Sequence, residues 1–313
     1  MMTFLKPYCR PAIWGGSRLS AYYQTELDNI AEAWVYSVLK GQSSTTQDGT
    51  PLADYLLQSG ESQEQIEKQP LIKYIDTSDF LSVQVHPDDI YAQCVEGKPN
   101  GKTEMWYILH AEPDAFVYMG LATSRDVFLE ALSCGQPEKA LKKVYVKEGD
   151  VFFIPPGMVH ALGKGITLLE VQQPSDLTYR LWDYERRDSE GNLRPLHTEK
   201  ALDVLKSYSQ SQLNAMQFSE PLSAEWLKKA EGHRAVLAAT PYFYVVLGKN
   251  EAISCVASEH SPACLLILEG EGTLCENGIS FEVKAGDSIL LQSQTEIMLA
   301  GQFTYALVAL PTS

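Results

Sequence analysis

The chain has few cysteines and no long hydrophobic run. Its 313 residues include six cysteines, spread along the sequence without a C-x-x-C pair. This spacing predicts reduced thiols in a cytoplasmic protein and not a disulfide framework. The longest apolar runs, such as residues 264–268, fall far short of the roughly 20 residues that cross a bilayer. Residues 1–16 contain Lys6, Arg10 and two prolines without a continuous apolar stretch, so they predict no secretory signal.

Basic residues are also in short supply. The 25 lysines and arginines face 40 aspartates and glutamates, which gives a formal net charge of -15. A surface of this sign repels the phosphates of nucleic acids and anionic lipid headgroups. We therefore expect neither a nucleic-acid nor a membrane partner. If the ligand is a small anion, its site needs a local cluster of Lys and Arg that overrides the global charge.

Short apolar segments separated by turn residues dominate what is present. The segments are residues 81–86, 105–109, 151–154, 166–171, 242–247, 265–268 and 289–291. This pattern predicts an all-β protein of the barrel or sandwich type. Helical periodicity occurs only between these segments, at 124–134 and at 198–208, where Thr198 is a candidate cap. Helices are thus expected as insertions and connectors.

A weak internal repeat indicates two related barrels. Residues 149–155 align with residues 286–292, because each is a Gly-Asp turn that leads into an apolar strand. In this alignment Pro155, Gly157 and His160 fall opposite Gln292, Gln294 and Ile297. The second copy keeps the strand and loses the polar residues.

Polar residues alternate with apolar ones in the segment 81–89. As a strand, it places Ser82, Gln84 and His86 on one face. An inward Gln and His, two residues apart, present an oxygen and an imidazole nitrogen to the same point. This arrangement is half of a metal site.

Two further residues can complete the site. Glu104 opens an apolar strand after a loop with two glycines, and His160 follows a Pro-Pro-Gly turn that fixes the backbone. The mixed nitrogen and oxygen set suits zinc and leaves room for a ligand. Taken singly, each of these residues can equally be an ordinary buried histidine or a solvated carboxylate. The in-phase pair and the turn together favour the metal.

Several motifs resemble those of a known family. The turn from Gly149 to His160 resembles the second motif of the cupin superfamily. Four segments resemble class I mannose-6-phosphate isomerases of the short bacterial form: Gln-Val-His-Pro (84–87), Gly-Lys-Thr-Glu-Met-Trp-Tyr (101–107), Pro-Pro-Gly-Met-Val-His-Ala (155–161) and Ser-Asp-Leu-Thr-Tyr-Arg (175–180). The likeness covers roughly the first two thirds of the chain. It implies two cupin (jelly-roll) barrels with helical insertions and a helical connector.

The resemblance implies a zinc enzyme with a defined ligand set. The family's zinc ligands fall on Gln84, His86, Glu104 and His160, the four that the strand pattern nominates. The implied reaction is aldose-ketose isomerisation of mannose 6-phosphate and fructose 6-phosphate through an enediol. The expected partner is therefore a small-molecule sugar phosphate, and the expected cofactor is Zn²⁺.

Further roles are implied for residues that match the family's active site. Arg180 is expected to stabilise enediolate charge, and its alternative is a surface arginine paired with Asp183 or Glu185. Glu170 is a candidate base, although another carboxylate or a zinc-bound water can take this role. Lys73 and Lys102 are expected to hold the phosphate or sugar hydroxyls. The resemblance thus implies Arg180, Glu170 and Lys102 as catalytic residues, and Lys73, Ser82, Lys102 and Arg180 as substrate-binding residues.

The predicted organisation is two domains. Residues 1–235 form the catalytic, metal-binding domain with its helical insertions, and residues 236–313 form a degenerate cupin-like domain without metal ligands. The polar stretch 209–224 is the expected seam. Two other functions stay open: another cupin metalloenzyme such as a dioxygenase, and a non-catalytic sugar-binding or regulatory protein. The oligomeric state is left open.

Overall fold

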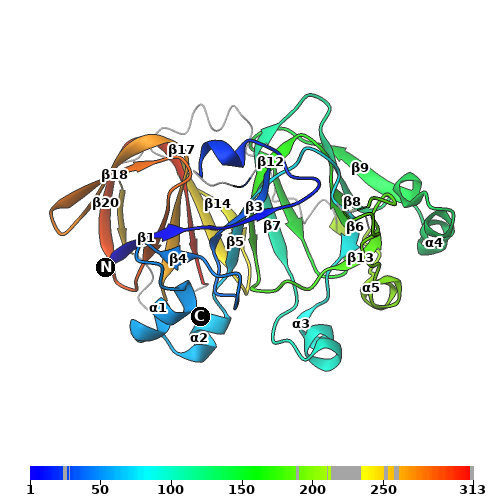
Figure 1. The fold of residues 1–313 in the computed structure, drawn as a ribbon, viewed down its shortest axis with the longest axis horizontal. Coiled ribbons are helices and arrows are strands. Elements are labelled where there is room, and N and C mark those ends of the chain that lie inside the picture. The colour runs from blue at the N-terminus through cyan, green and yellow to red at the C-terminus, as the bar shows by residue number, and fades with distance from the viewer. Residues whose placement is uncertain are drawn as a thin grey trace.

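The computed structural model is mostly β, as the sequence predicts. It describes residues 1–23, 27, 29–187, 190–209, 211–212, 234–249, 253–256 and 261–310. The strands form sheets of nine, six and five strands, and short helices lie at the periphery (Figure 1). Most of the expected seam, residues 210 and 213–224, lies outside the described residues. Among the described residues, no helix is both long and apolar enough to cross a membrane.

The three sheets have mixed sequence origins. The nine-stranded sheet contains β1 (Met2–Lys6), β4 (Thr45–Thr46), β14 (Arg234–Ala239), β15 (Tyr244–Lys249), β16 (Ile253–Val256), β17 (Ala263–Glu276), β18 (Ile279–Lys284), β19 (Ser288–Leu291) and β20 (Glu296–Ala309). The six-stranded sheet contains β2 (Tyr8–Pro11), β3 (Ile30–Tyr36), β5 (Leu71–Asp76), β7 (Glu104–Ala111), β10 (Val151–Ile154) and β12 (Ile166–Gln172). The five-stranded sheet contains β6 (Val83–Val85), β8 (Phe116–Leu121), β9 (Leu141–Tyr145), β11 (His160–Leu162) and β13 (Tyr179–Trp182).

The helices are short connectors. They are α1 (Leu52–Gln58), α2 (Gln63–Glu67), α3 (Asp89–Tyr91), α4 (Arg125–Ser133), α5 (Thr198–Val204), η1 (Leu19–Ala21), η2 (Ala92–Glu96) and η3 (Pro137–Ala140). The helix predicted at 124–134 is confirmed as α4, and Ser124 caps it by accepting from the Val127 amide. The helix predicted at 198–208 is shorter. His197 is its N-cap instead of Thr198, and Leu205 leaves the helical conformation so that the Lys206 amide can donate to the Gly157 carbonyl.

Strand β1 joins the two ends of the chain. It pairs antiparallel with β19, with Met2 opposite Leu291, so a strand of the first few residues lies in the C-terminal sheet. One buried cluster contains Val35 and Leu169 of the six-stranded sheet together with Leu266 of the nine-stranded sheet. These two sheets therefore share a core (Figure 1). The division between residues 235 and 236 stays a prediction, and it lies within β14.

Strand register places the polar residues in two rows. In the five-stranded sheet, His160 on β11 is opposite Gln84 on β6, and Gln84 is opposite Arg180 on β13. In the six-stranded sheet, Lys73 on β5 is opposite Glu170 on β12. Residues directly opposite each other on neighbouring strands project from the same face of a sheet. The register therefore brings together side chains that lie far apart in the sequence.

Candidate metal centre and cavity

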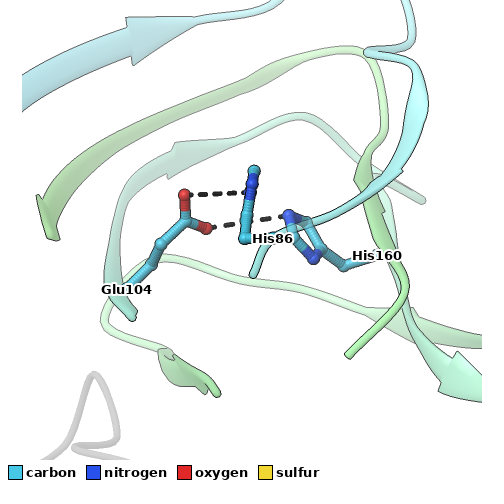
Figure 2. Close-up of side chains that lie close together, drawn as sticks. All are labelled: His86, Glu104 and His160. Carbon is cyan, nitrogen blue, oxygen red and sulfur yellow. Dashed lines mark ion pairs between the residues drawn. The ribbon is translucent and has the colours of Figure 1, made fainter. Parts of the chain in front are cut away.

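Three buried side chains converge on one point. His86 Nε2 lies 3.3 Å from Glu104 Oε1, and His160 Nε2 lies 3.6 Å from Glu104 Oε2. Figure 2 shows both imidazoles directed at the two oxygens of the carboxylate. The three donor atoms lie within 4.8 Å of one another. The sequence pattern had nominated these residues as a set, and they can hold a metal ion.

Backbone carbonyls fix the tautomer of both histidines. His86 Nδ1 donates to the Leu177 carbonyl at 2.8 Å, and His160 Nδ1 donates to the Met158 carbonyl at 2.9 Å. Because a carbonyl oxygen only accepts, the proton is on Nδ1 and the lone pair of Nε2 faces Glu104. Burial lowers the pKa of His86 to about 4 and also lowers the pKa of His160. Both imidazoles are therefore neutral near pH 7, as metal ligation requires.

Gln84 reaches the same point from the neighbouring strand. Its amide Nε2 lies 3.4 Å from His160 Nε2, and its Oε1 accepts from Ser82 Oγ at 3.2 Å. A half-turn of the amide exchanges the two ends and directs the oxygen at the histidines, since its O and N are nearly identical in shape. Gln84 is thus placed to be a fourth donor.

The residues present fit a divalent metal ion. Oε1 of the buried Glu104 carboxylate has the Lys102 ammonium at 2.5 Å, whereas Oε2 has no hydrogen-bond donor among the described residues. An ionised carboxylate is costly to bury unless a cation compensates it. Two neutral imidazole nitrogens, a carboxylate oxygen and an amide oxygen form a donor set that suits a catalytic metal with an open position.

A cavity of about 580 Å³ adjoins these residues. Its lining comes from both the five-stranded and the six-stranded sheets and includes the predicted residues Lys73, Ser82, Gln84, Lys102, Glu170 and Arg180. Seven lysines and arginines line it, against four carboxylates. The acidic protein therefore has a cationic cavity, which is the local cluster that an anionic ligand needs.

Lys102 lies against the metal centre. Its Nζ is 2.5 Å from Glu104 Oε1 and 3.5 Å from His86 Nε2. Burial lowers the pKa of Lys102, but the carboxylates of Glu104 and Glu170 outweigh this effect and leave the pKa raised. Lys102 is consequently a fixed cation beside the donor set.

Lys73 also lines the cavity, between two carboxylates. Its Nζ lies 3.1 Å from Glu170 Oε1 and 3.8 Å from Glu32 Oε2, and it stands over the Trp34 ring at 4.7 Å. Trp106 Nε1 donates to the other oxygen of Glu170 at 2.9 Å. The sequence analysis missed Glu32 and Trp34 as site residues. Their spacing of two on the buried strand β3 is the signal that could have found them.

Arg180 lines the cavity and does not make the ion pair considered as its alternative. The Asp183 carboxylate is bound by Arg186, at 2.6 Å, and by Arg194. Arg180 Nη1 donates instead to the Pro195 carbonyl at 2.9 Å, and its buried Nε has no partner in the part of the chain that the structure describes. Burial lowers the pKa of Arg180, and the nearby Arg194 guanidinium lowers it further.

Among the cavity cations that the sequence did not predict, two arginines come from an edge strand and an irregular segment. Arg10 is on the edge strand β2, and Arg194 is in the segment between β13 and α5. Neither belongs to a periodic pattern, so the sequence offers no strand-based signal for them. His197, from the same segment as Arg194, also lines the cavity and accepts from the Arg180 amide at 3.2 Å.

A buried His/Glu/His site in a mostly β fold, whose neighbours Gln84 and Lys102 line a cationic cavity, defines a metal-site protein with room for a small anion. No protein-family model matches the chain. It is 34% identical over 302 residues to the mannose-6-phosphate isomerase ManA of Bacillus subtilis, with 92% of each chain covered. It is 33% identical over 304 residues to the mannose-6-phosphate isomerase of Streptococcus mutans, with 92% of this chain and 91% of the relative covered. The chain belongs to the mannose-6-phosphate isomerase family.

Solved structures show the same fold. The chain matches the mannose 6-phosphate isomerase of Bacillus subtilis with a TM-score of 0.83 and 27% identity, covering 98% of this chain and 99% of the other. A variant of the phosphomannose isomerase of Salmonella typhimurium matches with a TM-score of 0.76 over the full length of both chains. At 16% identity, this second likeness concerns the fold alone.

Proposed function

We propose that the protein is a zinc-dependent aldose-ketose isomerase that interconverts mannose 6-phosphate and fructose 6-phosphate. Two full-length relatives named for this activity support it, at 34% and 33% identity. The observation that carries the proposal is the Glu104 carboxylate, which faces the lone pairs of two neutral histidines beside a cavity with surplus positive charge. This combination suits a phosphorylated sugar better than oxygen chemistry.

The proposal includes the finer architecture and the compartment. We assign two cupin barrels, one in residues 1–235 and a degenerate one in residues 236–313. The cavity that the five-stranded and six-stranded sheets share supports the first barrel. The matching Gly-Asp turns at 149–150 and 286–287 support the second. The five cysteines whose side chains are described are all free thiols, which supports a cytoplasmic location.

Gln84, His86, Glu104 and His160 would hold the zinc ion. When bound, zinc supplies a Lewis acid that polarises a sugar carbonyl or orients sugar oxygens. Lys102 and Ser82, next to these ligands, are placed to hold hydroxyl groups of the substrate. The lysine ammonium donates hydrogen bonds and cannot accept them, which fixes the orientation of the sugar oxygens around it.

Glu170 is the proposed base. Its Oε2 is fixed by Trp106, and its Oε1 faces Lys73 at the cavity wall. From this position Oε1 takes the proton from one carbon of the C1–C2 pair and returns it to the other, so that no redox partner is needed.

Arg180 is the proposed stabiliser of negative charge that develops on the enediolate. It is opposite the ligand Gln84 on the adjacent strand, and no described carboxylate forms an ion pair with it. A guanidinium that is not already neutralised can respond to new charge without first breaking a bond. We therefore assign Arg180 to the reacting carbons.

The proposal is tested by incubating the purified zinc protein with mannose 6-phosphate in D₂O and following the sugar by NMR. We expect fructose 6-phosphate to form, with solvent exchange at C1 or C2. Glu170→Gln should retain its metal and lose both signals. Thermal stabilisation by the sugar without product would support the non-catalytic alternative, and oxygen consumption would support a dioxygenase. Either result would overturn the isomerase.

A further inference from the structure

The two buried lysines of the cavity, Lys73 and Lys102, are already neutralised by carboxylates. Lys73 lies between Glu170, at 3.1 Å, and Glu32, at 3.8 Å. Lys102 lies 2.5 Å from Glu104. A dianionic phosphate placed on either ammonium would also meet these buried carboxylates, and like charges at short distance repel strongly in a poorly solvated site. The lysines are therefore poor candidates for the phosphate group.

Arg180 and Arg194, which also line the cavity, carry a surplus of positive charge. The single carboxylate of Asp183 is shared by Arg186 and Arg194. Arg180 has no ion pair among the described residues, and its buried Nε has no hydrogen-bond partner. Arg186 also pairs with Asp79 at 3.3 Å, whereas at the cavity wall Arg194 has only the shared Asp183 carboxylate and Arg180 has no ion pair among the described residues. An anion would satisfy the free donors and relieve the mutual repulsion of the arginines.

Arg194 is held in one orientation by its neighbours. Its Nε donates to Asp183 Oδ2 at 2.7 Å and its Nη2 to Oδ1, so the carboxylate grips one edge of the guanidinium. Asp183 is itself anchored through Arg186, which donates to the Phe80 carbonyl. The Nη1 group of Arg194 takes no part in these bonds, and Arg194 lines the cavity. A preorganised guanidinium of this kind loses little entropy when it binds an oxyanion.

The position of Arg194 suits the far end of a hexose phosphate. Arg180 is opposite the metal-site residue Gln84, whereas Asp183, which holds Arg194, lies three residues further along the chain. The phosphate on C6 is at the opposite end of the sugar from C1 and C2. With the reacting carbons at the metal, the phosphate would lie away from the metal ligands, and Arg194 is a cavity cation outside that ligand set.

We propose that Arg194, oriented by Asp183, binds the phosphate group of the substrate and determines the preference for phosphorylated sugars. This inference rests on the proposed isomerase function. It moves the phosphate away from Lys73, which pairs with Glu170, and from Lys102, which holds hydroxyl groups instead. It also separates two arginines by role, because Arg180 acts at the reacting carbons and Arg194 at the phosphate.

The test compares Arg194→Gln with Arg187→Gln in the zinc-loaded protein. Arg187 is an exposed arginine of the same segment that donates to the Gly191 carbonyl and does not line the cavity. For Arg194→Gln we expect KM for mannose 6-phosphate to rise at least tenfold and kcat to change less than threefold. Competitive inhibition by inorganic phosphate should weaken by a similar factor. Arg187→Gln should match the wild type in all three quantities.

Direct binding separates this inference from the proposed function. Calorimetric titration with inorganic phosphate needs no turnover, so it remains informative if the wild type does not isomerise mannose 6-phosphate. We expect wild type and Arg187→Gln to bind phosphate equally and Arg194→Gln to bind it at least tenfold more weakly. If Arg194→Gln does not fold, Arg194→Lys replaces it and should show a smaller loss of the same kind. An unchanged KM and an unchanged phosphate affinity in the folded variant would overturn the proposal.

Discussion

The two Gly-Asp turns of the chain share the same backbone geometry but lead to different chemistry. Gly149 and Gly286 both have left-handed backbones, with φ of 86° and 94°. Their amides donate to the carbonyls of Ile108 and Ile267, each at 2.9 Å. Asp150 and Asp287 accept from the amides three residues before them, at 2.9 and 2.8 Å. The repeat suggested by the sequence is thus a repeat of hydrogen bonds.

The strands that follow the two turns have the same register. The second copy has apolar residues where the first has polar ones. Ile154 of the first copy is opposite Glu104, and Leu291 of the second is opposite Ala263. Ala263 therefore occupies the position of the metal-site carboxylate. Ile297, which aligns with His160, is buried in an apolar cluster. The comparison teaches that the turn and the register specify the sheet, whereas a few inward side chains specify the site.

Removing one donor from the first copy should have the largest effect. We expect His160→Ala to lose its metal and to lower kcat/KM for mannose 6-phosphate about a thousandfold, because the remaining donors no longer close the coordination sphere. Metal analysis and a coupled isomerase assay measure the two effects on one preparation. His110→Ala, on the same strand as Glu104 but away from the cavity, is the control. Full activity in His160→Ala would show that the donor set is not the functional centre.

Introducing the carboxylate into the second copy should destabilise it. Ala263→Glu buries a charge in an apolar cluster without compensating donors, which should cost about 3 kcal/mol or more in the free energy of unfolding. Urea denaturation measures this quantity. Ala300→Glu, at an exposed position on β20, should change it by less than about 0.5 kcal/mol. Equal stability of the two variants would mean that the Ala263 position differs from the Glu104 position.

The buried histidines should make the metal-free protein sensitive to acid. The pKa of His86 is about 4 in the folded state and near 6.5 in the unfolded chain, so the unfolded state binds more protons between these values. Stability should fall as pH drops through this window, by about 2 kcal/mol between pH 7 and pH 5. Urea midpoints of the metal-free wild type and His86→Asn check this. If both lose the same stability, His86 is not the cause.

The smallest effect should be shared by the two turns. Asp150→Ala and Asp287→Ala each remove one side-chain acceptor from a backbone amide, which should cost about 1 kcal/mol in each case. Denaturation curves measure both variants, and isomerase activity serves as the functional readout. Activity should stay near that of the wild type in each, since neither residue lines the cavity. A large loss in only one of them would break the equivalence of the turns.

Local patterns made part of the site predictable. Strand alternation nominated Gln84 and His86, and the Pro-Pro-Gly turn nominated His160, because backbone geometry over a few residues decides where these side chains point. The mostly β fold followed from the same short-range signals.

Other parts of the molecule depend on contacts between distant residues. The pairing of β1 with β19 joins Met2 to Leu291, and no short-range pattern encodes it. Arg194 is held at the cavity by Asp183, which also pairs with Arg186. The sequence offered Asp183 as a possible partner of Arg180, but Arg186 and Arg194 bind that carboxylate instead. Competition of this kind is settled by tertiary packing.

The most direct test of the account is to measure zinc content and isomerisation of mannose 6-phosphate in one preparation as purified, after chelation, and after zinc is restored. We expect about one zinc ion per chain in the protein as purified. We also expect a rate that falls with the metal on chelation and returns with it. A metal-free preparation that converts mannose 6-phosphate at the original rate would contradict the central claim.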